Sequence, residues 1–149
     1  MSLETQINND IKAAMLAKEK TRLESLRAIK AAILVEKTKD GSETIADDAV
    51  VKIIQKLVKQ RKESAEIYQQ QNRPELAENE LAEIAGMEPY LPKQLSEDEI
   101  AAAIQGVIAQ VGATGPQDMG KVMGVATKQL AGQADGRVVS EIVKRLLNQ

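Results

Sequence analysis

Apolar residues recur at steps of three and four along the whole chain of 149 residues, and no segment alternates apolar and polar residues. Such steps place side chains on one face of an α-helix, whereas a half-buried strand requires alternation. The first series is Leu3, Ile7, Ile11 and Met15. The sequence therefore predicts an all-α fold.

Capping signals divide this pattern into seven helices. A capping box, in which Ser or Thr is followed three residues later by Glu, is expected at Thr21 and at Ser96. Met15 in the first helix and Leu81 in the fourth are expected to face inward. The other helices are expected to begin after Ser2, after Thr44, at Pro74, near Met119 and at Asp135-Gly136.

The segment Glu88-Pro89-Tyr90-Leu91-Pro92 interrupts the helical pattern. A residue that precedes proline disfavours helical backbone angles, so we expect an extended linker here. Tyr90, Leu91 and Pro92 are its expected anchor, and we expect Tyr90 to pack rather than to stack on a base. The linker divides the chain into a domain of residues 1–90 and a domain of residues 91–149.

The composition excludes several classes of chemistry. Without cysteine there are no disulfides, thiolate metal sites or thiol nucleophiles, and without histidine the commonest general base and metal ligand are missing. There is no phosphate-binding glycine loop, no membrane-length apolar run and no signal-peptide core. The composition does not exclude a catalytic pair of Ser and Lys. We expect a soluble cytoplasmic protein with no cofactor, metal, membrane partner or independent enzymatic activity; its oligomeric state is not predicted.

Two glycines stand four residues apart in the sixth helix, at Gly120 and Gly124. Glycine inside a helix costs about 1 kcal/mol relative to alanine, so both indicate that something approaches the backbone closely. The simpler interpretation is packing against the fifth or seventh helix. The alternative is a smooth patch for a nucleic-acid backbone, with Lys121 and Lys128 at its edge.

Two further features also have a structural and a functional interpretation. Asp135-Gly136 most simply caps the seventh helix, but with Arg137 beside the helix N-terminus it could form an anion site. Lys52, Lys56 and Lys59, with Arg61 and Lys62 nearby, form either a solvated helix face or a second contact with RNA or protein.

The charge distribution restricts how nucleic acid could be bound. The net charge is −2, and residues 70–99 carry eight acidic residues against two basic ones. This argues against a chain coated with nucleic acid but leaves a local contact open. Tyr68 and Tyr90 are the only aromatic residues, too few to stack a single strand. Any RNA bound is expected to be folded.

Three motifs resemble the YqeY family, which shares a domain with the tail of the GatB subunit of glutamine-dependent tRNA amidotransferase. Arg27 and the Asp40-Gly41 turn extend the resemblance over the whole chain. It implies a four-helix N-terminal unit followed by a compact three-helix unit similar to the GatB tail. The motifs are Tyr90-Leu91-Pro92-Lys93-Gln94-Leu95-Ser96, Met119-Gly120-Lys121-Val122-Met123-Gly124 and Ala134-Asp135-Gly136-Arg137-Val138-Val139.

In the amidotransferase, the similar tail contacts the outer corner of tRNA, and catalysis takes place elsewhere. The resemblance thus implies a non-catalytic accessory protein that binds tRNA or a tRNA-handling assembly. Alternatives are an adaptor whose glycine face docks a partner helix, and an accessory of the carbon–nitrogen ligase that uses glutamine as its amide donor. The candidate contact residues are Gly120, Lys121, Gly124, Lys128, Asp135, Gly136 and Arg137.

Overall fold

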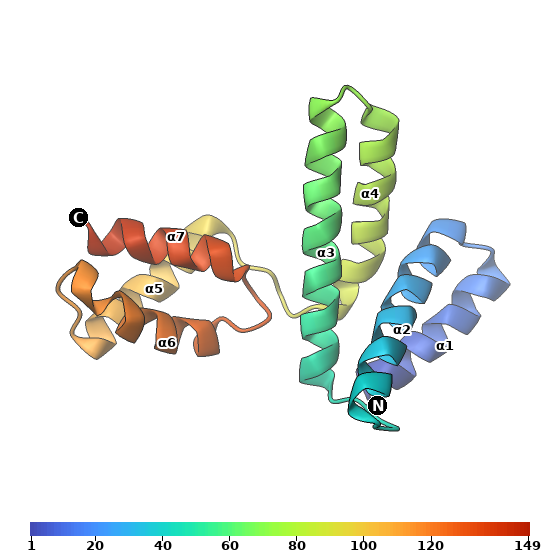
Figure 1. Ribbon diagram of the computed structural model, residues 1–149, viewed down its shortest axis with the longest axis horizontal. Coiled ribbons are helices and arrows are strands. Elements are labelled where there is room, and N and C mark those ends of the chain that lie inside the picture. The colour runs from blue at the N-terminus through green and yellow to red at the C-terminus, as the bar shows by residue number, and fades with distance from the viewer. The chain divides into compact units, whose positions relative to one another are not determined.

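The computed structural model describes residues 1–149 and is all-helical, which confirms the predicted fold class (Figure 1). The chain divides into two compact units, Met1–Leu91 and Pro92–Gln149. No helix has the length and apolar character needed to cross a membrane. The helices are α1 (Leu3–Ala17), α2 (Lys20–Asp40), α3 (Asp47–Gln70), α4 (Pro74–Met87), α5 (Glu97–Val111), α6 (Met119–Gln129) and α7 (Gly136–Leu147), with short 3₁₀ helices η1 (Glu88–Tyr90) and η2 (Pro116–Asp118).

The predicted cap at Ser2 and the capping box at Ser96 and Glu99 are confirmed, because both serine hydroxyls accept a backbone N–H in the first helical turn. The box predicted at Thr21 is wrong, since α2 begins one residue earlier, at Lys20. Lys18 ends α1 in a left-handed conformation with φ 57°. The connection is therefore so short that Thr21 already lies inside the helix.

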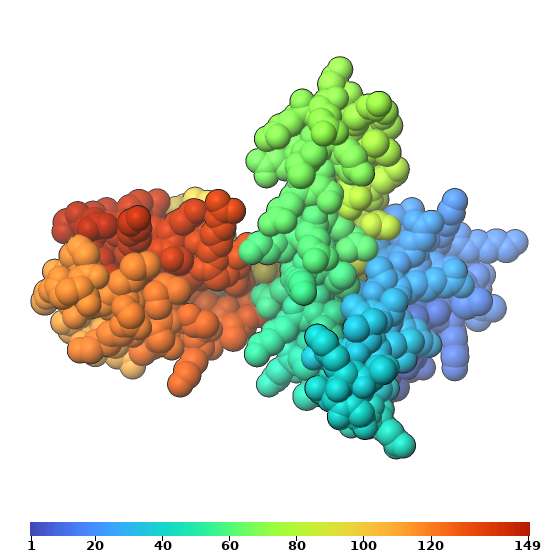
Figure 2. Space-filling view, in the orientation of Figure 1, coloured from blue at the N-terminus to red at the C-terminus, as the bar shows by residue number.

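The N-terminal unit buries the apolar faces of α1 to α4 in one core. Met15 was expected in this core but is 52% exposed, and Ala14 is buried instead. Each step of four residues overshoots a helical turn by about 40°, so three steps from Leu3 rotate the side chain well away from the core. Leu81 is also exposed, at 46%, and the buried positions of α4 are Ala77, Ile84 and Met87. The tip of the α3–α4 hairpin extends beyond α1 and α2 (Figure 1 and Figure 2).

Helices α2 and α4 meet at a position that has no room for a side chain. A Cβ atom on Gly86 would lie 2.6 Å from Ser25 Oγ and 2.8 Å from Ser25 Cβ. Ser25 is fully buried, and its hydroxyl donates toward the carbonyl oxygens of Glu83 at 2.9 Å and Thr21 at 3.2 Å. The Glu83 side chain forms an ion pair with Arg61 of α3 at 2.9 Å. Residues 83–86 therefore join α4 to both α2 and α3.

The N-terminal unit ends in a 3₁₀ turn, so the extended linker predicted for residues 88–90 is wrong. Glu88 has helical angles (φ −57°, ψ −32°) although it precedes a proline, whereas Leu91 is extended as expected. Tyr90 explains the difference, because its ring is buried and its hydroxyl donates to Asp10 Oδ2 at 2.6 Å. This bond to α1 and the burial of the ring hold the turn. Burial, reinforced by Asp10 and opposed by Arg22, raises the pKa of Tyr90 to about 12.

We expect Tyr90 to ionise near pH 12 rather than near its ordinary value of 10. Because the folded pKa is the higher one, the stabilisation is present below pH 10 and is lost as the pH rises toward 12. The measurement is phenolate absorbance in a Tyr68→Phe variant, where Tyr90 is the remaining tyrosine. The same variant in denaturant serves as the control, and ionisation near pH 10 in the folded protein would contradict the prediction.

We expect Gly86→Ala to lower the free energy of unfolding by about 1–2 kcal/mol, because overpacking against Ser25 exceeds the gain in helix propensity. Gly106→Ala in α5 is the matched control, since a Cβ there meets nothing within 4 Å. That change should stabilise the protein by up to about 1 kcal/mol. Urea unfolding followed by circular dichroism measures both, and equal effects would refute the close contact.

Candidate nucleic-acid interface

Helix α6 packs on α5 and α7 through one face and leaves its two glycines on the other. Val122 and Ala126 are fully buried in the core of the C-terminal unit. Gly120 and Gly124 each lie two residues from these positions, about 200° around the helix. Both glycines are exposed, and a Cβ atom on either would meet nothing within 4 Å. The packing interpretation of these glycines is therefore wrong.

The missing side chains leave an open hollow of about 600 Å³ on α6. Four of the candidate residues line it together: Gly120, Lys121, Gly124 and Lys128. Val125 and Gln129 also line it and were not predicted, although Val125 lies four residues after Lys121 and Gln129 four residues after Val125, on the same side of the helix. The hollow belongs to a single helix and has a backbone floor.

Lys121 and Lys128 are exposed at this hollow, and neither forms an ion pair. Asp118, just before α6, accepts the backbone N–H of Thr114 at 2.9 Å. This hydrogen bond, with a smaller contribution from the charge of Lys121, lowers the pKa of Asp118. Asp118 thus holds the η2 turn together and offsets part of the charge of Lys121.

The polar side chains at the start of α7 form interactions within the helix. Asp135 Oδ1 accepts the backbone N–H of Arg137 at 2.9 Å, so the predicted cap is confirmed. Arg137 Nε lies 3.5 Å from Glu141 Oε1, and both side chains are largely exposed. Glu141 was not predicted, although a spacing of four residues indicates such a pair. Asp135, Gly136 and Arg137 do not line the hollow on α6.

Hydrogen bonds connect the first sequence motif to the loop that precedes the third motif within the C-terminal unit. The Gln94 side-chain amide donates to the carbonyl oxygens of Gly132 at 2.7 Å and Pro92 at 2.8 Å. The backbone N–H of Leu95 donates to the carbonyl of Gln133 at 2.9 Å. These bonds hold the loop between α6 and α7, in which Gly132 adopts φ 79°. The contact joins residues distant in sequence, and nothing in the local pattern predicts it.

Comparison with known proteins identifies the family. The family model described as "Yqey-like protein" matches residues 4–147, nearly the whole chain. The chain belongs to this YqeY-like family. The resemblance carried by the three motifs is thereby confirmed.

Curated relatives of this YqeY-like chain are fungal proteins named "Altered inheritance of mitochondria protein 41, mitochondrial". The protein from Pyrenophora tritici-repentis is 28% identical over 145 residues, which cover 95% of this chain and 79% of the relative. The protein from Lachancea thermotolerans is 29% identical, with 74% of this chain and 60% of the relative covered. The protein from Clavispora lusitaniae is 33% identical, with 60% and 52% covered.

No three His, Cys, Asp or Glu side chains are grouped so that they could hold a metal ion. The arrangement on α6 offers instead a backbone surface and two free ammonium groups. Such a surface can contact an anion or a closely packed chain.

We expect Asp118 to titrate below its ordinary pKa of 3.8. Because the folded pKa is the lower one, its stabilisation is present above pH 3.8 and is lost as the pH falls through the folded value. The backbone amide resonance of Thr114 should report this titration by NMR, and Asp118→Asn should abolish the change. A midpoint at or above 3.8 in the folded chain would rule out the proposed hydrogen bond.

Proposed function

We propose that this YqeY-like protein is a non-catalytic accessory protein that binds structured RNA, such as tRNA, through the exposed face of α6. The observation that supports this most directly is the open hollow at Gly120 and Gly124, with Lys121 and Lys128 beside it. Two glycines that cost helix stability and have no packing partner in the chain are explained if an external backbone approaches them.

The chemistry of the hollow suits phosphates better than bases. Lys121 and Lys128 are separated by seven residues, about 10 Å along the helix, so they would contact different phosphate groups. The C-terminal unit contains no aromatic residue that could stack on a base. Binding would therefore depend on shape and charge and would weaken steeply with added salt.

A second candidate function is a protein adaptor, which the lining of the hollow favours. Val125 and the bare backbone of Gly120 and Gly124 form a smooth, partly apolar strip that a partner helix could cover. A third candidate, an accessory of glutamine-dependent amide transfer, is supported by the family resemblance alone.

A cytoplasmic location fits the absence of cysteine, while the three fungal relatives are named as mitochondrial proteins.

We expect the full chain to bind folded tRNA in a filter-binding or mobility-shift titration at low salt. Replacing Lys121 and Lys128 by Gln should reduce the slope of log K against log salt by roughly 1.5–2, since each lost phosphate contact accounts for about 0.9. Lys144→Gln with Arg145→Gln, in the last turn of α7, removes the same charge from the same unit and is the matched control.

Other outcomes identify the alternatives. No binding at micromolar protein would reject direct RNA contact, and a partner that stays bound after nuclease digestion would then support the adaptor. Gly124→Ala should weaken the contact, whereas Gly106→Ala, which alters an equally open glycine in α5, should not. An unchanged rate of amidation of mischarged tRNA, when the protein is added to the core amidotransferase, would eliminate the third candidate.

A further inference from the structure

We infer that the N-terminal unit carries a second phosphate-binding surface, formed by Lys52, Lys56 and Lys59 on the exposed face of α3. These three residues are called the α3 lysine row. The inference rests on the proposed function, because it assigns a further contact to the same structured RNA. It concerns a different unit and different residues from the hollow on α6.

The α3 lysine row lies opposite the buried face of its helix. Val50 and Ile54 are fully buried, and Val58 is 6% exposed, whereas all three lysines are exposed. None of the three forms an ion pair. Arg61 in the same helix behaves differently, because it is half-buried and bonded to Glu83 at 2.9 Å. The lysines of the row have no such internal role.

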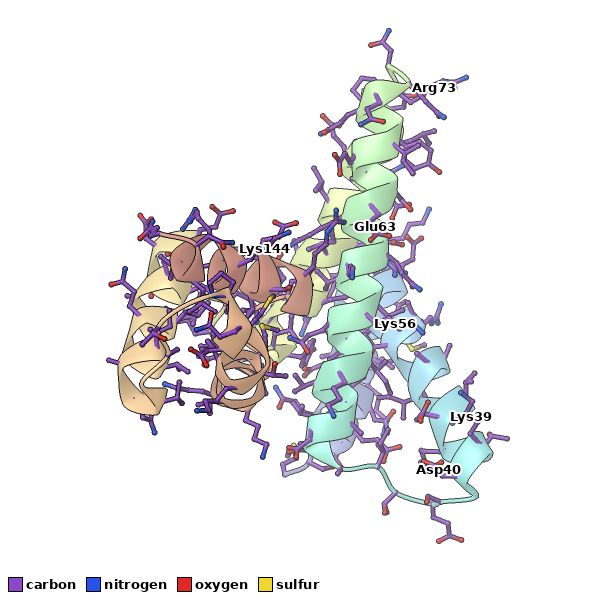
Figure 3. All side chains as sticks on the ribbon, turned by 60° about the vertical axis from the view of Figure 1, so that its left-hand side comes forward. Lys39, Asp40, Lys56, Glu63, Arg73 and Lys144 are labelled. Carbon is purple, nitrogen blue, oxygen red and sulfur yellow. The ribbon has the colours of Figure 1, made fainter.

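Along α3 itself, the neighbours of the row are most basic at its centre. No acidic residue occurs in α3 between Asp48 and Glu63, which bracket the row. Asp48 precedes Lys52 by four residues and Glu63 follows Lys59 by four, so the two outer lysines each have an acidic neighbour on the helix. Lys56, labelled in Figure 3, has Lys52 and Lys59 as its neighbours. Among the three lysines, Lys56 therefore has the most basic neighbours along the helix.

The row fits a polyanion better than a protein or a membrane. Protein interfaces depend on buried apolar or aromatic anchors, and surface-bound helices insert large apolar side chains. The row has neither, because its other exposed neighbours on the helix, Gln60 and Lys62 among them, are polar or charged. A straight row of three ammonium groups spans about 10 Å and can contact successive phosphates. Among the large exposed apolar side chains of this unit, only Ile67 belongs to α3, and it lies two turns beyond Lys59; the others are Met1, Met15, Leu16, Leu34, Val35 and Leu81.

The test compares two triple variants of the full chain in the tRNA titration. Replacing Lys52, Lys56 and Lys59 by Gln should lower the slope of log K against log salt by roughly 2–3, at about 0.9 for each phosphate contact. Glutamine has a helix propensity close to that of lysine, so the fold should be unaffected. The control replaces Lys12, Lys20 and Lys30 by Gln, removing three exposed charges scattered over α1 and α2, and should change the slope by less than 1.

Single substitutions sharpen the result, since Lys56→Gln should weaken binding more than Lys52→Gln or Lys59→Gln. If the row variant and the scattered control behave alike while Lys121 and Lys128 still matter, the row is overturned and the proposed function stands. If the unaltered protein binds no folded tRNA at low salt, both are overturned. Binding of an acidic protein through the row in that case would assign it a different partner and also refute the inference.

Discussion

The close contact between Ser25 and Gly86 is the constraint on which the N-terminal unit depends. It brings α2 against the backbone of α4, and the same turn of α4 holds α3 through the ion pair of Glu83 with Arg61. The buried Ser25 hydroxyl lies 2.9 Å from the carbonyl oxygen of Glu83 in α4 and 3.2 Å from that of Thr21 in its own helix, and the first of these bonds depends on the close approach. The missing side chain at Gly86 thus sets the spacing of α2 and α4, and the ion pair in the same turn joins α3 to them.

Three of the helix caps were predicted from local signals, although the box predicted at Thr21 was wrong. The caps at Ser2, Ser96 and Asp135 lie within three residues of the amides they bind, and all three are present. The turn at Glu88–Tyr90 could not be predicted in this way, since a bond to Asp10, eighty residues away, holds it. The need for glycine at position 86 could not be predicted for the same reason, because the side chain that leaves no room for a Cβ atom there belongs to another helix.

The candidate site was predicted in part. Helical spacing placed Gly120, Lys121, Gly124 and Lys128 on one surface, as the structure does. The same spacing also argues against close packing of the glycines, since the buried Val122 and Ala126 lie two residues from them and therefore on the opposite face. The bonds from Gln94 and Leu95 to the α6–α7 loop depend on the folded chain and had no local signal. The spacing of glycines in a sequence therefore does not distinguish packed from exposed glycines until the buried face of their helix has been assigned.

Both tyrosines belong to the N-terminal unit, Tyr68 on α3 and Tyr90 in η1. With no tryptophan or phenylalanine in the chain, the unit that carries the α6 hollow has no intrinsic chromophore beyond its peptide bonds. Tyrosine fluorescence would report the unfolding of the N-terminal unit and would not detect the unfolding of the C-terminal unit. A single smooth transition seen with that probe would describe only the N-terminal unit, and an introduced aromatic residue in the second core would make its stability visible.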